Sequence, residues 1–83
     1  SLTSSIVHPR EVFKPLIEHN VACVILAHNH PSGDSTPSAE DNSITQRLVT
    51  IGTVMGIKVL EHIIIGGEGR YFSYLDSGTM PTP

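Results

Sequence analysis

The chain has 83 residues, a net charge of −3 and a hydrophobic fraction of 39%. This length fits one domain near the lower limit for a self-sufficient core, and the composition is that of a globular chain. The five Lys and Arg residues are scattered, so the basic stripe of a nucleic-acid binder is missing and we expect no direct nucleic-acid contact. A single cysteine excludes an internal disulfide, and no apolar run approaches the ~20 residues of a membrane span. We therefore expect a cytoplasmic protein with no membrane contact.

The first part of the chain predicts a strand end followed by a helix. Residues 1–7 are typical of the tail of a strand, and His8-Pro9 is typical of a helix start, because proline is tolerated at the first helical position. We expect His8 to serve as a helix cap or a buried hydrogen-bonded residue, with a place beside the functional site as the alternative. The helix should end at His19-Asn20, and Pro15 should kink or divide it.

The next stretch predicts a metal site within one strand–loop–helix unit. Residues 21–27 are apolar or small without polar alternation, which is typical of a strand covered on both faces. His28 and His30 end this strand, and their i, i+2 spacing places them on the same side of the sheet. After a loop punctuated by Pro and Gly, Asp41 lies in the first turn of a helix, from which its carboxylate can fold back over both histidines. The spacing therefore predicts a three-ligand site formed by His28, His30 and Asp41.

Two imidazoles and one carboxylate suit zinc, and three protein ligands leave a position for water, as in catalytic zinc sites. Cys23 cannot complete the set, because it lies on the opposite face of the strand and roughly 16 Å from the histidines. A purely structural alternative also exists. Ser38-x-x-Asp41 before an apolar helical pattern resembles a capping box, and Asp is favoured at a helix N-terminus. For Ser38 we expect a helix-cap role in any case.

The second half of the chain predicts a helix, a strand and a hairpin. Apolar residues at helical spacing indicate an amphipathic helix from Ala39 to Met55 that stops at Gly56. Residues 57–65 should form a strand, and a glycine-rich turn should lead to a returning strand over 70–75. Within these strands we expect a satisfied core or edge histidine at His62, and packed tyrosines with wet hydroxyls at 71 and 74. The tail from Asp76 should be frayed.

The motif resembles that of a known enzyme family. His28-x-His30, seven residues, Ser38, two residues and Asp41 match the pattern of the JAMM (MPN+) metalloproteases. The segments 8–13, 27–34, 36–38 and 63–66 resemble the RadC branch of that family. The resemblance implies that His28, His30 and Asp41 bind Zn²⁺ and that Ser38 helps to stabilise the oxyanion during catalysis. It also implies a single RadC-type domain over residues 1–83.

The order of elements predicts an α/β fold in which helices flank a mixed sheet, as in the JAMM fold, which resembles the deaminase fold. Two positions depart from the family. Ser35 stands where RadC sequences usually carry proline, and the glutamate that serves as general base would lie on a strand upstream of this sequence. We therefore expect the domain to be N-terminally incomplete. Glu40 should point away from the cleft, because adjacent helical positions differ by about 100°.

These observations lead to one favoured function and two alternatives. We expect a zinc-dependent metallopeptidase domain in which a metal-activated water attacks an amide carbonyl, and the resemblance implies a peptide or isopeptide substrate. The first alternative is a non-catalytic metal-binding or protein-interaction module. The second is the DNA-repair role that the RadC label implies, against which the acidic composition counts.

Overall fold

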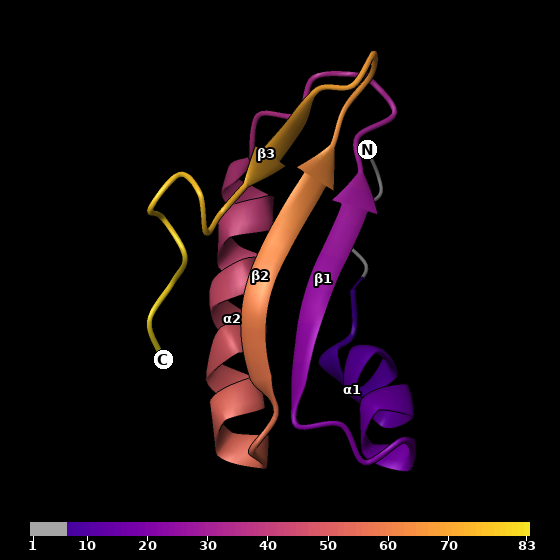
Figure 1. Ribbon diagram of the computed structural model, residues 1–83, viewed down its shortest axis with the longest axis vertical. Helices are drawn as coiled ribbons and strands as arrows, with labels where there is room; N and C mark the ends of the chain where they lie inside the picture. The colour runs from indigo at the N-terminus through magenta and orange to yellow at the C-terminus, as the bar shows by residue number, and fades with distance from the viewer. Residues whose placement is uncertain (1–6) are drawn as a thin grey trace.

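A computed structural model of the chain describes residues 7–83 (Figure 1). Its elements are, in chain order, α1 (Pro9–Glu18), β1 (Cys23–Asn29), α2 (Ala39–Met55), β2 (Lys58–Ile65) and β3 (Tyr71–Ser73). The strand tail predicted for residues 1–7 lies outside the described residues except for Val7, which belongs to no strand. No helix of the described part is long and apolar enough to cross a membrane.

The three strands form one mixed sheet in the order β1-β2-β3. β1 runs parallel to β2, and β3 returns antiparallel to β2, so the predicted α/β class with a mixed sheet is confirmed (Figure 1). α2 is the crossover between the two parallel strands. Because Asn29 pairs with Ile65, both parallel strands reach their carboxyl ends at the same edge of the sheet. That edge is where α/β sheets place their functional sites.

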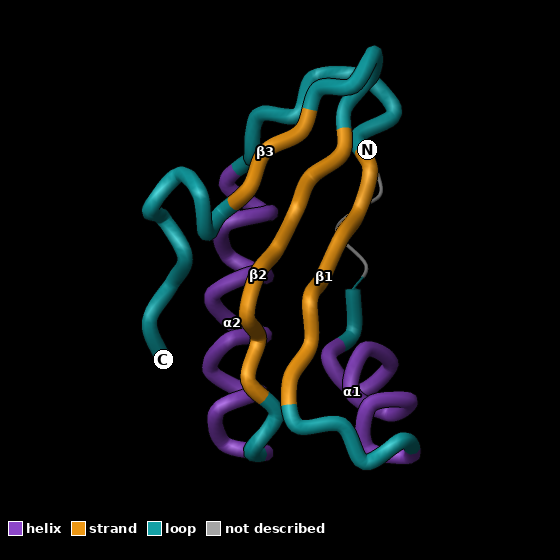
Figure 2. Tube along the Cα trace, in the orientation of Figure 1, coloured by secondary structure: helices purple, strands orange, loops and turns teal. Residues whose placement is uncertain are grey.

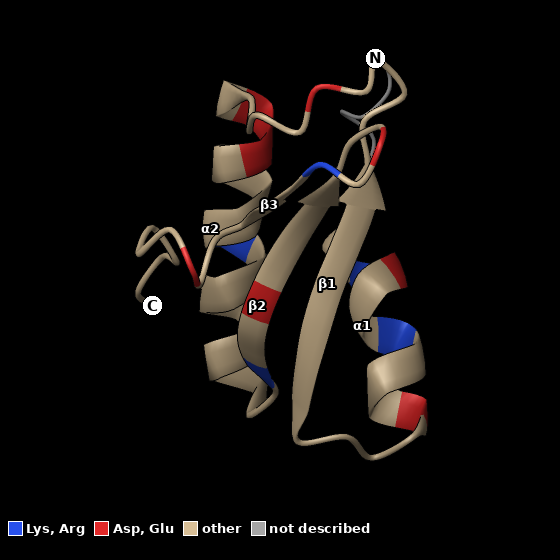
Figure 3. Cartoon of the chain, turned by 45° about the horizontal axis from the view of Figure 1, so that its top comes forward, with Lys and Arg blue, Asp and Glu red and all other residues tan. Residues whose placement is uncertain are grey.

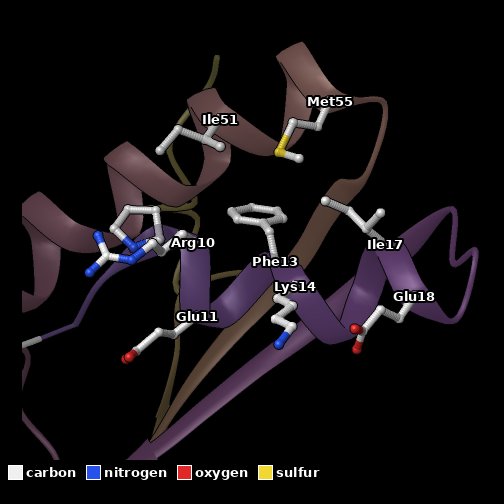
Figure 4. A pocket seen from close by; sticks show the side chains of 9 residues that line it. Arg10, Glu11, Phe13, Lys14, Ile17, Glu18, Ile51 and Met55 are labelled. Atoms are coloured by element: carbon white, nitrogen blue, oxygen red, sulfur yellow. The ribbon is translucent and has the colours of Figure 1, made fainter.

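Both helices contribute to a core on one face of the sheet. Phe13 of α1, Leu48 of α2 and Ile57 form its buried centre, and the partly buried Val24 and Leu26 of β1 pack against it. In Figure 4, Phe13 lies between the two helices and faces α2. On the other face, Ile25 is 61% exposed.

The prediction that β1 is covered on both faces is therefore wrong. Burial alternates along the strand between exposed and half-buried residues, although nearly all of them are apolar. An apolar composition allows a strand to be covered on both faces, but the packing of the helices determines which face is covered. The strand also begins and ends two residues later than predicted, so that His28 is part of it.

The helix ends follow local signals. α1 has Pro9 at its start and continues through Pro15, so it is not divided into two pieces. His8 occupies the cap position, but its exposed side chain makes no cap hydrogen bond. Asn20 adopts the left-handed conformation just after the helix, with φ of 55°. α2 has the predicted bounds and ends at Gly56, where φ of 74° favours glycine.

The C-terminal segment differs from the predicted frayed tail. Tyr74 is buried and its hydroxyl donates a hydrogen bond to Asn42 Oδ1 at 2.7 Å, so this hydroxyl is not wet as predicted. Tyr71, by contrast, is 62% exposed. The amide of Thr79 donates to the Tyr74 carbonyl at 3.0 Å, and Gln46 of α2 donates to the Thr82 carbonyl at 3.1 Å. These polar contacts hold the segment against α2, and composition alone does not reveal them.

Glu61 of β2 is a buried carboxylate that fixes the chain after β3. It accepts hydrogen bonds from the Ser73 hydroxyl, from the Leu75 amide at 3.0 Å and from the His62 amide at 2.8 Å. Burial raises the pKa of this carboxyl, but the hydrogen bonds outweigh burial, so the pKa lies below the ordinary 4.5. Glu61 is thus occupied structurally and lies apart from the candidate ligands.

This depressed pKa predicts how Glu61 affects stability. The unfolded chain takes up the proton first, so the contribution of Glu61 is present above pH 4.5 and is lost as the pH falls below it. Glu61→Gln should lower the free energy of unfolding by about 2 kcal/mol at neutral pH. Urea titrations should show this difference shrinking below pH 4.5, whereas the exposed Glu68→Gln should change little at any pH. A difference that is the same at neutral and acidic pH would contradict the assignment.

Candidate metal centre

The structure brings the three predicted ligands together at the carboxyl end of β1. His28 lies near the end of β1, His30 follows the strand, and Asp41 lies in the first turn of α2. His28 Nε2 is 3.0 Å from Asp41 Oδ1, and His30 Nε2 is 2.9 Å from Asp41 Oδ2. One ligand atom from each residue lies within 4.8 Å of the others. The group could therefore bind a metal ion, and the identity of the metal stays a prediction.

The hydrogen bonds of the histidine rings suit a cation between these atoms. His30 Nδ1 lies 2.8 Å from the Asp34 carbonyl oxygen, which can only accept, so Nδ1 carries the proton. In the neutral ring, Nε2 then presents a lone pair to the Asp41 carboxylate. Two acceptors at 2.9 Å repel each other unless a proton on Nε2 or a metal cation lies between them. Around a tetrahedral zinc ion such N···O separations are about 3.3 Å, close to those found here.

The loop that carries His30 is held by the turn between β2 and β3. The His30 amide donates to the Ile65 carbonyl at 2.9 Å, and the Gly33 carbonyl accepts from the Gly67 amide at 2.8 Å. The two loops lie side by side at the top of Figures 1 and 2. A Cβ on Gly66 would lie 2.5 Å from the Gly33 oxygen, so only glycine permits this approach. Asp34 also accepts from the Thr36 amide through its side chain, as turn aspartates commonly do.

Asp41 is both a candidate ligand and part of a capping box. The Ser38 hydroxyl accepts from the Asp41 amide at 3.0 Å, and the Ser38 amide donates to Asp41 Oδ2 at 2.8 Å. Burial raises the pKa of Asp41, but the hydrogen bonds from Ser38 and the adjacent imidazoles outweigh it, so the pKa lies below 3.8. The structural alternative and the ligand arrangement therefore coexist. Ser38 accepts a bond as the cap, and its hydroxyl proton can still be donated.

Two further residues complete the cluster, and sequence reasoning missed their role. His62 is buried, as predicted for a satisfied core histidine, with its Nδ1 2.6 Å from Thr45 Oγ1. Its Nε2 lies 2.9 Å from His28 Nδ1. Burial, together with the adjacent His28, lowers the pKa of His62 to about 4. The spacing of Thr45, four residues after Asp41 on one helix face, was an available signal. The contact of His62 depends on the β1–β2 register, which the sequence does not specify.

A cleft of about 620 Å³ opens beside the candidate ligands. Its polar lining includes His28, Asp41 and His62, and Leu26 and Leu48 contribute apolar walls. Glu40 also lines this cleft, so the prediction that it points away is wrong. The cleft extends around the first turn of α2, so two adjacent helical positions both border it. The first turn of α2 holds Glu40 and Asp41, and Figure 3 shows acidic residues at this end of the helix.

A second groove lies between α1 and α2, with a volume of about 750 Å³. Ile17, Ile51 and Met55 line it together with Phe13, and its charged rim consists of side chains of α1 (Figure 4). None of the candidate ligands borders this groove. The candidate chemistry is therefore confined to the cleft at the carboxyl end of β1.

The fold and the ligand cluster define an α/β domain with a candidate metal centre in one strand–loop–helix unit. Residues 1–79 match the family model described as RadC-like JAB domain, and the chain belongs to this family. A UPF0758 protein of Trichlorobacter lovleyi is 59% identical over 80 residues, covering 96% of this chain and 34% of the relative. A UPF0758 protein of Syntrophotalea carbinolica is 58% identical over 80 residues, covering 96% and 35%. The chain thus spans about a third of the length of these curated relatives.

Proposed function

We propose that the chain is the metal-binding part of a zinc-dependent hydrolase that cleaves an amide bond of a peptide or isopeptide. The observation that supports this most is the convergence of His28 Nε2, His30 Nε2 and the Asp41 carboxylate beside a cleft. Three protein ligands leave a position open for water, which favours a catalytic site over a structural one. The RadC-like JAB family agrees with this function.

The residues of the site divide the work of amide hydrolysis. Bound zinc supplies a Lewis acid and lowers the pKa of water toward neutrality. Two neutral imidazoles and one carboxylate leave a net charge of +1, which preserves that Lewis acidity. The Ser38 hydroxyl, which accepts a hydrogen bond from the Asp41 amide, would donate a hydrogen bond to the developing oxyanion. The cleft walls formed by Leu26 and Leu48 hold an apolar part of the substrate.

The intact protein should hydrolyse peptide amides, lose this activity with a chelator and regain it with zinc. Ser38→Gly should lower kcat by about 10²–10³ through loss of the oxyanion donor. Glycine is an acceptable N-cap, so the free energy of unfolding should fall by only a few tenths of a kcal/mol. Product formation measured by mass spectrometry tests both expectations. Hydrolysis that persists without any divalent metal would refute the zinc mechanism.

A non-catalytic metal-binding or interaction module is the second candidate. It is favoured by the buried Glu61, whose carboxylate is held by Ser73 and Leu75 and is therefore not free to serve as a general base. Zinc binding by the intact protein without any amide hydrolysis would select this candidate.

For partners we propose a peptide and no direct nucleic-acid contact. The Lys and Arg residues of the described chain are dispersed over α1, α2, β2 and the turn before β3 (Figure 3). Among residues 7–83 they form no continuous basic stripe of the kind that contacts the phosphate backbone of a nucleic acid. The single cysteine is compatible with a cytoplasmic location, which we also propose.

A further inference from the structure

A chain of hydrogen bonds leads from the backbone of α2 to the candidate ligand His28. Thr45 Oγ1 lies 2.6 Å from the Asp41 carbonyl oxygen. A carbonyl oxygen cannot donate, so in this short contact the Thr45 hydroxyl must use its only hydrogen to donate a hydrogen bond to the Asp41 carbonyl. The Thr45 oxygen is then an acceptor for any other partner.

The direction of the next two bonds follows from this first one. His62 Nδ1 lies 2.6 Å from Thr45 Oγ1, and since the hydroxyl proton is already used, Nδ1 must donate. His62 is 4% exposed, and a buried imidazolium without a carboxylate partner for its ring would be costly. The ring is therefore neutral, and its Nε2 is an acceptor. His28 Nδ1, at 2.9 Å, donates to it.

We propose that His62, oriented by Thr45, is a positioning residue that holds the proton of His28 on Nδ1 and keeps His28 Nε2 free to bind the metal. Tyr74 supports the arrangement, because its ring stacks on His62 at a centroid distance of 5.2 Å and an interplanar angle of 4°. The stack fixes the plane in which both His62 nitrogens lie. Partners of this kind orient metal-binding imidazoles and set their tautomer.

The opposite direction of the Thr45–His62 hydrogen bond would prevent His28 from binding a metal. If Thr45 donated to His62 instead, the neutral His62 ring would carry its proton on Nε2 and donate it to His28. The neutral His28 would then carry its own proton on Nε2, toward Asp41 Oδ1, and could not bind a metal there. His30 needs no such help, because the Asp34 carbonyl at 2.8 Å fixes its tautomer directly. The two candidate histidines thus obtain the same tautomer by different means.

The inference rests on the proposed metal site, and Thr45→Val tests it in the intact protein. Valine keeps the shape of threonine but cannot accept the hydrogen bond from His62 Nδ1. We expect zinc affinity to fall by about 10–100-fold. Thr45→Ser should restore it, since the hydroxyl returns. Thr53→Val is the matched control: its hydroxyl makes the same type of bond within α2, to the Val49 carbonyl at 3.0 Å, away from His62. Its zinc affinity should be unchanged.

A second measurement needs neither a variant nor a metal. Long-range ¹H–¹⁵N spectra of the metal-free protein should show His62 protonated at Nδ1 and unprotonated at Nε2. A proton on His62 Nε2 would overturn the inference, even if Thr45→Val failed to fold. Equal zinc affinity for wild type and Thr45→Val would overturn it too, while leaving the proposed hydrolase intact. Absence of zinc binding by the wild type would instead refute the proposed function and this inference with it.

Discussion

Protein purified without chelator should carry about one zinc ion per chain, and the double variant His28→Ala, His30→Ala should carry none. The variant removes both nitrogen ligands and leaves only the Asp41 carboxylate. A single carboxylate binds zinc weakly. Metal content measured by inductively coupled plasma mass spectrometry gives the stoichiometry directly. The large effect is expected because the candidate site has three protein ligands and no fourth His, Cys, Asp or Glu donor joins them among residues 7–83.

The matched control removes two histidines that lie elsewhere. His8 and His19 are both exposed, one at each end of α1, so the double variant His8→Ala, His19→Ala should keep its zinc. Binding should also stabilise the wild type, by about 2.7 kcal/mol when free zinc is at one hundred times its dissociation constant. Equal zinc content in the His28, His30 variant and the wild type would place the metal somewhere else.

Hydrolysis by residues 1–83 alone should be nearly undetectable, even with zinc bound. A positioned general base contributes typically ~10²–10⁴-fold, and the family resemblance places that glutamate upstream of this sequence. A longer protein that includes it should cleave peptide amides at the higher rate. Changing that upstream glutamate to Gln should abolish the rate and leave the zinc content unchanged. Circular dichroism of residues 1–83 should accompany the assay, so that inactivity is not mistaken for unfolding.

Glu40 provides the decisive comparison, because it lines the same cleft as His28 and Asp41. Glu40→Gln should leave the rate of the longer protein within a few-fold of the wild type, since the base is expected elsewhere. If residues 1–83 cleave as fast as the longer protein, and Glu40→Gln removes that activity, then Glu40 is the base. The assignment of the upstream glutamate would then be wrong.

Where a structural feature depends on neighbours in the sequence, the sequence predicted it well. The ends of α2 follow from Ser38 and Gly56, whose conformations are set by local hydrogen bonds and by a left-handed φ. The cluster of His28, His30 and Asp41 was equally predictable, because a strand end and the next helix start are joined by one short loop. The alternation of side chains along a strand places the two histidines on one side, and the position of Asp41 in the first turn of the helix brings its carboxylate to them.

Features that depend on distant segments were not predictable in this way. The exposed face of Ile25 results from both helices packing on one side of the sheet. The contact of His62 with His28 requires the parallel register in which Leu26 faces His62. Tyr74 donates to Asn42, from which it is separated by 32 residues. No local pattern encodes a partner at that separation.

The difference between local and distant partners bears on how the chain would acquire the proposed metal while folding. The candidate ligands occupy residues 28–41, so gathering them closes only a short loop, at a small cost in chain entropy. His62 lies 34 residues from His28 and arrives only when β2 docks beside β1. An unfolded chain would therefore bind the proposed ion weakly, and full affinity would require the native sheet. The strength of metal binding would then report the pairing of two parallel strands, a slow non-local step in folding.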